Sequence, residues 1–136
     1  MGSWDIDAFG NDTAADWGWT LDGIDDLSVV EETLDRILST GNDYLDASIA
    51  EEGVAAVEAL ARAQGKGGAS TAFTESVDSW VTRLKALPSS SLSTKAVTVV
   101  DRIITAPSEL LELWNETEDK DRWMQYMVDL RMRVSA

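Results

Sequence analysis

Apolar side chains recur at three- and four-residue spacing along most of the chain, and this periodicity restricts the fold to packed helices. The clearest example follows Ser28, where Val30, Leu34, Ile37 and Leu38 stand at the i, i+4, i+7 and i+8 positions of one helical face. Nothing in the sequence shows the alternating pattern and two-residue turn of a β-hairpin, and no internal repeat occurs. The sequence therefore predicts an all-α protein.

Capping residues and helix breakers set the expected boundaries. The patterns Ser-x-x-Glu at 28–31 and 48–51 predict capping boxes at the heads of two helices. Glycine clusters and the Pro88-Ser-Ser-Ser segment separate further periodic stretches. The expected helices cover about 13–21, 28–40, 48–64, 75–87, 93–105 and 109–115, with a last one after residue 121 that carries Trp123 to Val134. At 136 residues we expect the chain to form one compact domain, 1–136, an array of six to seven helices with a short extended N-terminal segment.

The opening segment combines aromatic and acidic residues. Trp4, Ile6 and Phe9 are apolar side chains in a stretch too short to bury them, so we expect them to insert between helices as a plug. Asn11 or Asp12 is a suitable N-cap for the first helix. Among the later tryptophans, Trp80 is expected in the core, and Trp114 and Trp123 are expected to pack together.

The acidic residues of this segment allow a chemical alternative. Asp5, Asp7, Asp12 and Asp16 could form a carboxylate-based, metal-assisted enzyme site. The calcium-loop pattern that starts at Asp5 fails at two ligand positions, since Phe9 and Asp16 stand where an oxygen donor and a bidentate glutamate belong. The chain has no histidine and no cysteine, which excludes the usual catalytic triads and zinc sites. We therefore expect no catalytic residue, no metal and no cofactor.

The charge is distributed unevenly along the sequence. Residues 1–60 hold 15 acids and one base, Arg36, whereas the remaining residues hold 10 acids and 10 bases. The entire net charge of −14 therefore lies in the first 60 residues. Such a surface repels nucleic acid and anionic membranes and attracts basic surfaces. The two interpretations are a solubilising surface and a docking face for a basic partner.

Two specific motifs stand at the ends of the chain: Met1-Gly-Ser-Trp-Asp5 with Phe9-Gly-Asn-Asp-Thr-Ala-Ala-Asp-Trp17, and Ser108-Glu-Leu-Leu-Glu-Leu-Trp114 with Trp123. Together with Tyr44-Leu45 and Ala50-Glu51 between them, they make nearly the whole chain resemble a bacterial family known as domain of unknown function 4259. Asp5 departs from the family, which usually has glycine there. The resemblance implies a small acidic protein with no catalytic residues to carry over. Some members resemble immunity proteins that stand beside polymorphic toxins.

The resemblance and the charge lead to one functional expectation. We expect a non-catalytic, cytoplasmic immunity protein that occludes a cognate toxin domain, a protein that is basic or acts on nucleotides. Trp19 is the expected anchor, because Trp17 is the better candidate for the core. The other expected partner-binding residues are the acids Asp22, Asp25, Asp26, Glu31, Glu32, Asp35, Asp43 and Asp46. The alternatives are the carboxylate enzyme and an inhibitor that mimics nucleic-acid charge.

Overall fold

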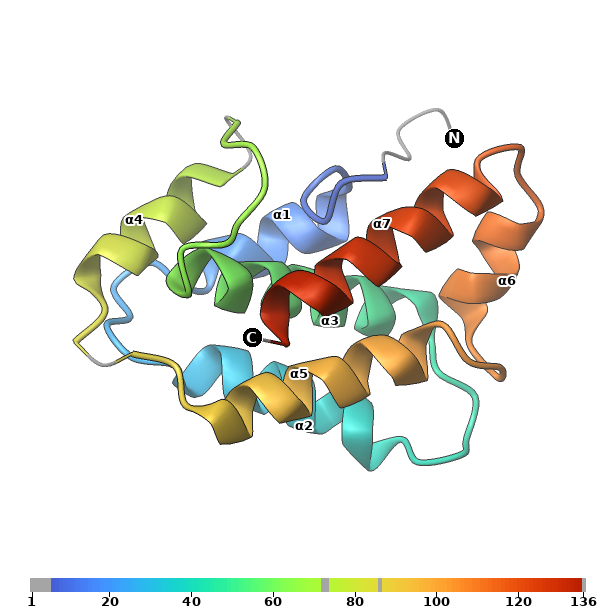
Figure 1. Ribbon diagram of the computed structural model, residues 1–136, viewed down its shortest axis with the longest axis horizontal. Coiled ribbons are helices and arrows are strands. Elements are labelled where there is room, and N and C mark those ends of the chain that lie inside the picture. The colour runs from blue at the N-terminus through green and yellow to red at the C-terminus, as the bar shows by residue number, and fades with distance from the viewer. Residues whose placement is uncertain (1–5, 72–73, 86, 136) are drawn as a thin grey trace.

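The computed structural model describes residues 6–71, 74–85 and 87–135, and within them the chain is all-α as predicted (Figure 1). The described residues form seven helices, and none of these is long and apolar enough to cross a membrane. The helices are α1 (Asp12–Trp19), α2 (Ser28–Ser39), α3 (Ala47–Ala63), α4 (Glu75–Arg83), α5 (Ser90–Ile103), α6 (Glu109–Asn115) and α7 (Lys120–Val134).

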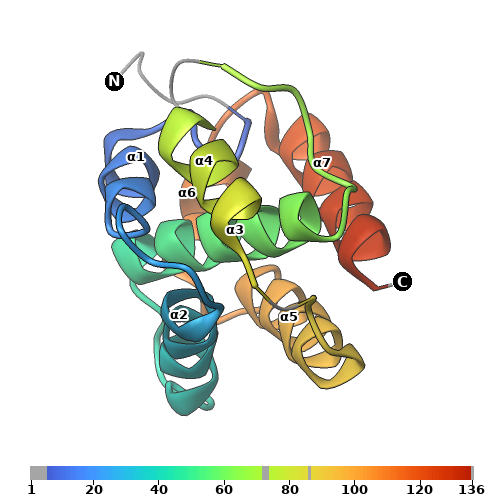
Figure 2. The same cartoon turned by 90° about the vertical axis from the view of Figure 1, so that its left-hand side faces the viewer.

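The alanine-rich helix α3 lies at the centre of the fold. It contacts each of the other six described helices, and Figure 2 shows the others arranged around it. Every residue from Gly53 to Ala61 is buried, so α3 has no solvent face along this stretch. Small side chains permit this, because they let neighbouring helices approach closely. The closest approach is at Gly53, where an added Cβ would lie 2.8 Å from Cδ1 of Ile37 on α2.

Two helix boundaries differ from the predicted ones by three residues or more. Helix α4 ends at Arg83 rather than at about Leu87, because Leu84 adopts an extended backbone with ψ of 133°. The chain leaves the helix there to cross to the start of α5 (Figure 1). Helix α5 begins at Ser90 rather than Ser93, because the hydroxyl of Ser89 accepts a hydrogen bond from the Leu92 N–H and caps the helix.

Both predicted capping boxes are wrong, although their helices are present. Ser28 lies inside α2, and the carboxylate of Asp26 accepts hydrogen bonds from the Ser28 N–H at 3.1 Å and hydroxyl at 2.6 Å. Helix α3 starts at Ala47, whose N–H donates to Glu109 of α6 at 2.8 Å. The free N–H groups of a helix start need an acceptor, but that acceptor can come from outside the four-residue motif.

The N-terminal segment packs against the helices as predicted at Phe9. This side chain is buried, and its ring centroid lies 6.4 Å from that of Trp17. Ile6 is half-buried against the core, whereas Trp4 lies outside the described residues. Asn11 is the N-cap of α1, since its Oδ1 accepts from the Ala14 N–H at 2.8 Å. The segment therefore enters α1 with a fixed direction.

The later tryptophans also lie as predicted. Trp80 is fully buried. Trp114 of α6 and Trp123 of α7 are buried and stacked, with ring centroids 6.0 Å apart and an interplanar angle of 9°. This stack joins the two C-terminal helices to each other beside α3.

Candidate protein-binding surface

Helix α1 separates its two tryptophans between the core and the solvent. Trp17 is buried, and its indole Nε1 donates to Oγ1 of Thr33 on α2 at 2.8 Å. Trp19 is 65% exposed. The prediction that Trp17 rather than Trp19 faces the core is confirmed. An indole left mostly in water forgoes the free energy that its burial would contribute. The exposure of Trp19 is therefore the strongest indication of a binding surface on this helix.

Two carboxylates share the outer face of α1 with this indole. Asp12, Asp16 and Trp19 stand at the i, i+4 and i+7 positions, which lie along one side of a helix. Asp22 follows in the next turn, where its N–H donates to the Trp19 carbonyl at 3.1 Å. All four residues are exposed. We call them the Trp19 face.

The Trp19 face is supported from beneath by α4. The guanidinium of Arg83 donates to the carbonyl oxygens of Leu21 at 2.7 Å and Ile24 at 3.2 Å. The indole of Trp80 donates to the carbonyl of Asp26 at 2.9 Å. These bonds hold the connection between α1 and α2 in one conformation. The backbone on both sides of Asp22 is therefore anchored to α4, which lowers the entropy lost when a partner binds there.

Several of the predicted acidic residues already have an ion pair or a hydrogen bond within the chain. Lys95 of α5 lies 2.8 Å from Asp35 and 3.1 Å from Glu31, and hydrogen bonds to these two carboxylates raise the pKa of Lys95. Lys85 lies 2.8 Å from Asp25. Hydrogen bonds from the hydroxyl and N–H of Ser28 hold the pKa of Asp26 below its usual value.

The nine predicted partner-binding residues do not gather on one patch. Trp19 and Asp22 precede α2, whereas Asp43 and Asp46 follow it. Helix α2 has 12 residues, which separates its ends by about 18 Å. Asp46 occupies the N-cap position of α3 without a side-chain cap bond, and Arg102 donates to the backbone oxygen of Asp43 at 2.6 Å. The acidic half of the sequence therefore divides into at least two surfaces.

Ion pairing distinguishes the exposed acids from one another. Within the described part of the chain, several exposed carboxylates from the first 60 residues have no ion pair; they are Asp12, Asp16, Asp22, Asp26, Glu32, Asp43 and Asp46. Three of these seven belong to the Trp19 face. The sequence predicts Asp12 as a candidate N-cap and both Asp12 and Asp16 as part of the alternative enzyme site, whereas their i, i+4, i+7 spacing with Trp19 is the signal that places them on this face.

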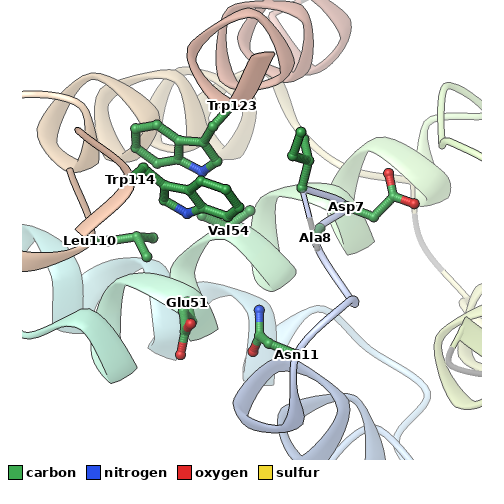
Figure 3. A pocket seen from close by; sticks show the side chains of 9 residues that line it. Asp7, Ala8, Asn11, Glu51, Val54, Leu110, Trp114 and Trp123 are labelled. Carbon is green, nitrogen blue, oxygen red and sulfur yellow. The ribbon is translucent and has the colours of Figure 1, made fainter. Parts of the chain in front are cut away.

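Among the described residues, the acidic side chains proposed for the alternative enzyme site do not form a cluster. No group of three or more potential metal ligands comes together there, and Asp5 lies outside them. A space of about 20 Å³ beside Trp114 and Trp123 is lined by Asp7 and Glu51, but the Asp7 carboxylate points away from Glu51 (Figure 3). Burial raises the pKa of Glu51. This volume holds one water molecule and no larger substrate.

A family model described as a domain of unknown function (DUF4259) matches residues 2–126. No curated protein and no solved structure matches the chain.

Proposed function

The chain belongs to the DUF4259 family, and we propose that it is a non-catalytic protein that binds a basic protein partner through the Trp19 face. One observation carries this proposal. An indole that is 65% exposed lies on a rigid helix among three carboxylates that have no ion pair in the described chain. An apolar anchor surrounded by charges of one sign is the arrangement expected at a protein interface.

The indole and the carboxylates have different tasks in this proposal. Trp19 supplies affinity, because a tryptophan that becomes buried in a partner's pocket removes a large apolar area from water. Asp12, Asp16 and Asp22 supply the direction of approach, because unpaired carboxylates attract lysine and arginine side chains over several ångströms. Exposed ion pairs add little affinity by themselves, so loss of the indole weakens the complex more than loss of one aspartate.

The family resemblance suggests the kind of partner. We infer that the partner is a toxin domain and that the chain acts as its immunity protein in the cytoplasm. Neutralisation of a toxin requires only that a rigid, complementary surface covers the active site, and no reaction is needed. A basic toxin domain, such as one that acts on nucleotides or nucleic acid, would match the charge of the Trp19 face.

Parallel affinity capture tests the proposal. The wild-type protein, Trp19→Ala and Met132→Ala are used as baits in lysate of the native host, and captured proteins are quantified by mass spectrometry. Met132 is a matched control, because it is a large apolar side chain of α7 that is 66% exposed. We expect a basic protein that is retained by the wild type and by Met132→Ala and is depleted at least tenfold on Trp19→Ala.

Two results would contradict the proposal. Equal recovery of all specific partners on Trp19→Ala and wild type would exclude the Trp19 face as the interface. A partner retained by Trp19→Ala and lost with Met132→Ala would place the interface on α7 instead.

A further inference from the structure

The turn that follows α1 contains the pair Asp22-Gly23, and no other Asp-Gly or Asn-Gly pair occurs in the sequence. Such pairs are reactive, because glycine has no Cβ to hinder a side chain that approaches its backbone nitrogen. Both residues are exposed. A Cβ built on Gly23 would have no atom within 4 Å, so the space beside this glycine is open. The carboxyl group of Asp22 can therefore reach the backbone of Gly23 without displacing a neighbour.

The backbone N–H of Gly23 donates no hydrogen bond within the described part of the chain, although the N–H groups on either side of it do. The N–H of Asp22 donates to the Trp19 carbonyl at 3.1 Å. The N–H of Ile24 donates to the Leu21 carbonyl at 3.0 Å. This second bond, with a φ of +79° at Gly23, is the pattern of a type II turn whose two central residues are Asp22 and Gly23. The peptide between them is the one that no hydrogen bond holds.

The two aspartates that precede an alanine differ in this respect. Ala8 follows Asp7, and its N–H donates to a tyrosine hydroxyl of α7 at 3.1 Å. Ala47 follows Asp46, and its N–H donates to a glutamate of α6 at 2.8 Å. A nitrogen engaged in this way must give up its hydrogen bond before it can attack a carboxyl group. Asp22 is followed by a nitrogen that is neither hindered nor engaged.

The anchors of this turn still allow its central peptide to rotate. Arg83 of α4 holds the carbonyl oxygens of Leu21 and Ile24, which lie on either side of the central pair. Rotation of the central peptide changes ψ of Asp22 and φ of Gly23 together and leaves the Cα atoms in place. Glycine accepts both signs of φ, so no Cβ opposes this rotation. Over part of it, the Gly23 nitrogen lies on the same side of the chain as the Asp22 carboxyl group.

We propose that Asp22-Gly23 is a site of spontaneous covalent modification that yields isoaspartate. The Gly23 nitrogen attacks Cγ of the protonated Asp22 carboxyl group. The hydrogen of the nitrogen and the OH of the carboxyl group leave as one water molecule, and a five-membered succinimide ring forms. A second water molecule then opens the ring. Opening at the former backbone carbonyl leaves the main chain running through Cγ, which is isoaspartate, and opening at the other carbonyl restores aspartate.

Isoaspartate changes the Trp19 face. One additional CH₂ group enters the main chain between Leu21 and Ile24, so their hydrogen bond of 3.0 Å cannot keep its geometry. The carboxylate of residue 22 then stands directly on Cα rather than at the end of a side chain. The consequence for a partner rests on the proposed function, in which Asp22 is one of the unpaired carboxylates of this face. The modification itself does not depend on that function.

Incubation of the folded protein for several weeks in heavy-oxygen water tests the proposal. Each ring opening takes one oxygen atom from the solvent, so a converted residue is labelled before the protein is digested in ordinary water. Digestion with Asp-N protease, which does not cleave before isoaspartate, and mass spectrometry with electron-transfer fragmentation locate the label and the isomer. We expect both at residue 22, at a level at least about tenfold above residues 7 and 46.

The same measurement in urea separates the effect of the fold from that of the sequence. Glycine favours the reaction at Asp22 in any conformation, whereas only folding engages the N–H that follows Asp46. We therefore expect the ratio of label at Asp22 to label at Asp46 to be at least about threefold higher in the folded protein than in the unfolded chain.

Two variants test the ring itself. Asp22→Glu keeps the carboxylate and Gly23 but would need a six-membered ring, so we expect label at residue 22 to fall at least about tenfold. Asp22→Asn replaces the carboxyl group by an amide, which releases ammonia instead of water, and we expect it to convert faster than the wild type. Urea unfolding of each variant shows whether it is folded during the incubation.

Three results would overturn the proposal. Absence of isoaspartate at residue 22 in the folded wild type would mean that the turn keeps the carboxyl group away from the Gly23 nitrogen. A ratio of Asp22 to Asp46 label that is no higher in the folded protein than in urea would remove the role of the free N–H. Equal label in folded Asp22→Glu and wild type would exclude the ring. These measurements involve no partner, so they can fail while the proposed function holds, and the reverse.

Discussion

The close approach of α2 and α5 to α3 at Gly53 gives a sharp test of the fold. A Cβ at this position would lie 2.8 Å from Cδ1 and 3.0 Å from Cγ1 of Ile37, and 3.3 Å from Cδ1 of Ile103. Both isoleucines are fully buried, so neither side chain has free space to move into. Overpacking of this kind costs roughly 1–3 kcal/mol. Alanine also gains about 1 kcal/mol over glycine in helix propensity. We expect Gly53→Ala to lower the free energy of unfolding by about 1 kcal/mol.

Gly18 is the matched control, since it is also a buried glycine within a helix. A Cβ there would lie 3.5 Å from Cγ2 of Val77 and 3.6 Å from Cε1 of Phe9, which are ordinary contacts. Gly18→Ala therefore gains the helix propensity without the clash, and the free energy of unfolding rises by about 0.5–1 kcal/mol. The two alanine variants should differ by roughly 2 kcal/mol in urea unfolding followed by tryptophan fluorescence.

A second substitution identifies the clash as the cause. Ile37→Val removes Cδ1, the atom nearest to the added Cβ, and by itself costs about 0.5–1.5 kcal/mol. In the Gly53→Ala background it relieves the overlap, so most of that cost should disappear and the two substitutions should couple by about 1 kcal/mol. The reasoning is refuted if Gly53→Ala stabilises as much as Gly18→Ala, or if Ile37→Val costs the same in both backgrounds.

Three further predictions concern buried polar groups. Thr33→Val leaves the buried Trp17 indole N–H without its acceptor, and we expect the free energy of unfolding in urea to fall by roughly 1–3 kcal/mol; an unchanged value would contradict this role. Arg62→Met removes an ion-pair partner of buried Glu58 and the hydrogen bonds to the Gly68 and Ala69 carbonyls. The free energy of unfolding should therefore fall by roughly 3–5 kcal/mol, and limited proteolysis should cut the glycine-rich loop 65–71 first. First cleavage elsewhere would contradict the role of Arg62 in holding this loop. Burial raises the pKa of Tyr126 from 10.0 to about 12, so the folded state keeps the phenol proton after the unfolded chain has lost it. Stability should therefore fall as pH rises from 10 to 12, and it should fall less in Tyr126→Phe; equal pH profiles for the two proteins would contradict it.

Much of the fold could be predicted because helical periodicity is a local property. Val30, Leu34 and Ile37 give the buried face of α2 from spacing alone, and all three are fully buried. The helix starts were harder to predict, because the acceptors that satisfy them come from elsewhere. The N–H of Ala47 bonds to Glu109, which lies 62 residues away in the sequence, and no local motif contains that information.

The candidate surface could be predicted only in part. The excess of acidic residues in the first half is visible in the sequence, but the ones that stay unpaired depend on the bases that fold against them. Lys95 pairs with both Glu31 and Asp35, which lie about 60 residues earlier in the chain. The sequence analysis predicted that Trp17 rather than Trp19 faces the core, and the burial of the two side chains confirms it. The role of Trp19 and of the acidic residues in binding a partner stays a prediction.

The rate of association with the captured partner, measured at increasing salt, tests the central claim most directly. The wild type is compared with a variant that carries Asp12→Lys, Asp16→Lys and Asp22→Lys, and with one that carries Asp25→Lys, Asp26→Lys and Glu32→Lys. We predict that wild-type association slows at least about tenfold between low and high salt, and that reversal of the unpaired Trp19-face charges slows association more than reversal of the second set. A wild-type rate that is independent of salt, and unchanged by both charge reversals, would contradict the claim that this acidic surface binds a basic protein.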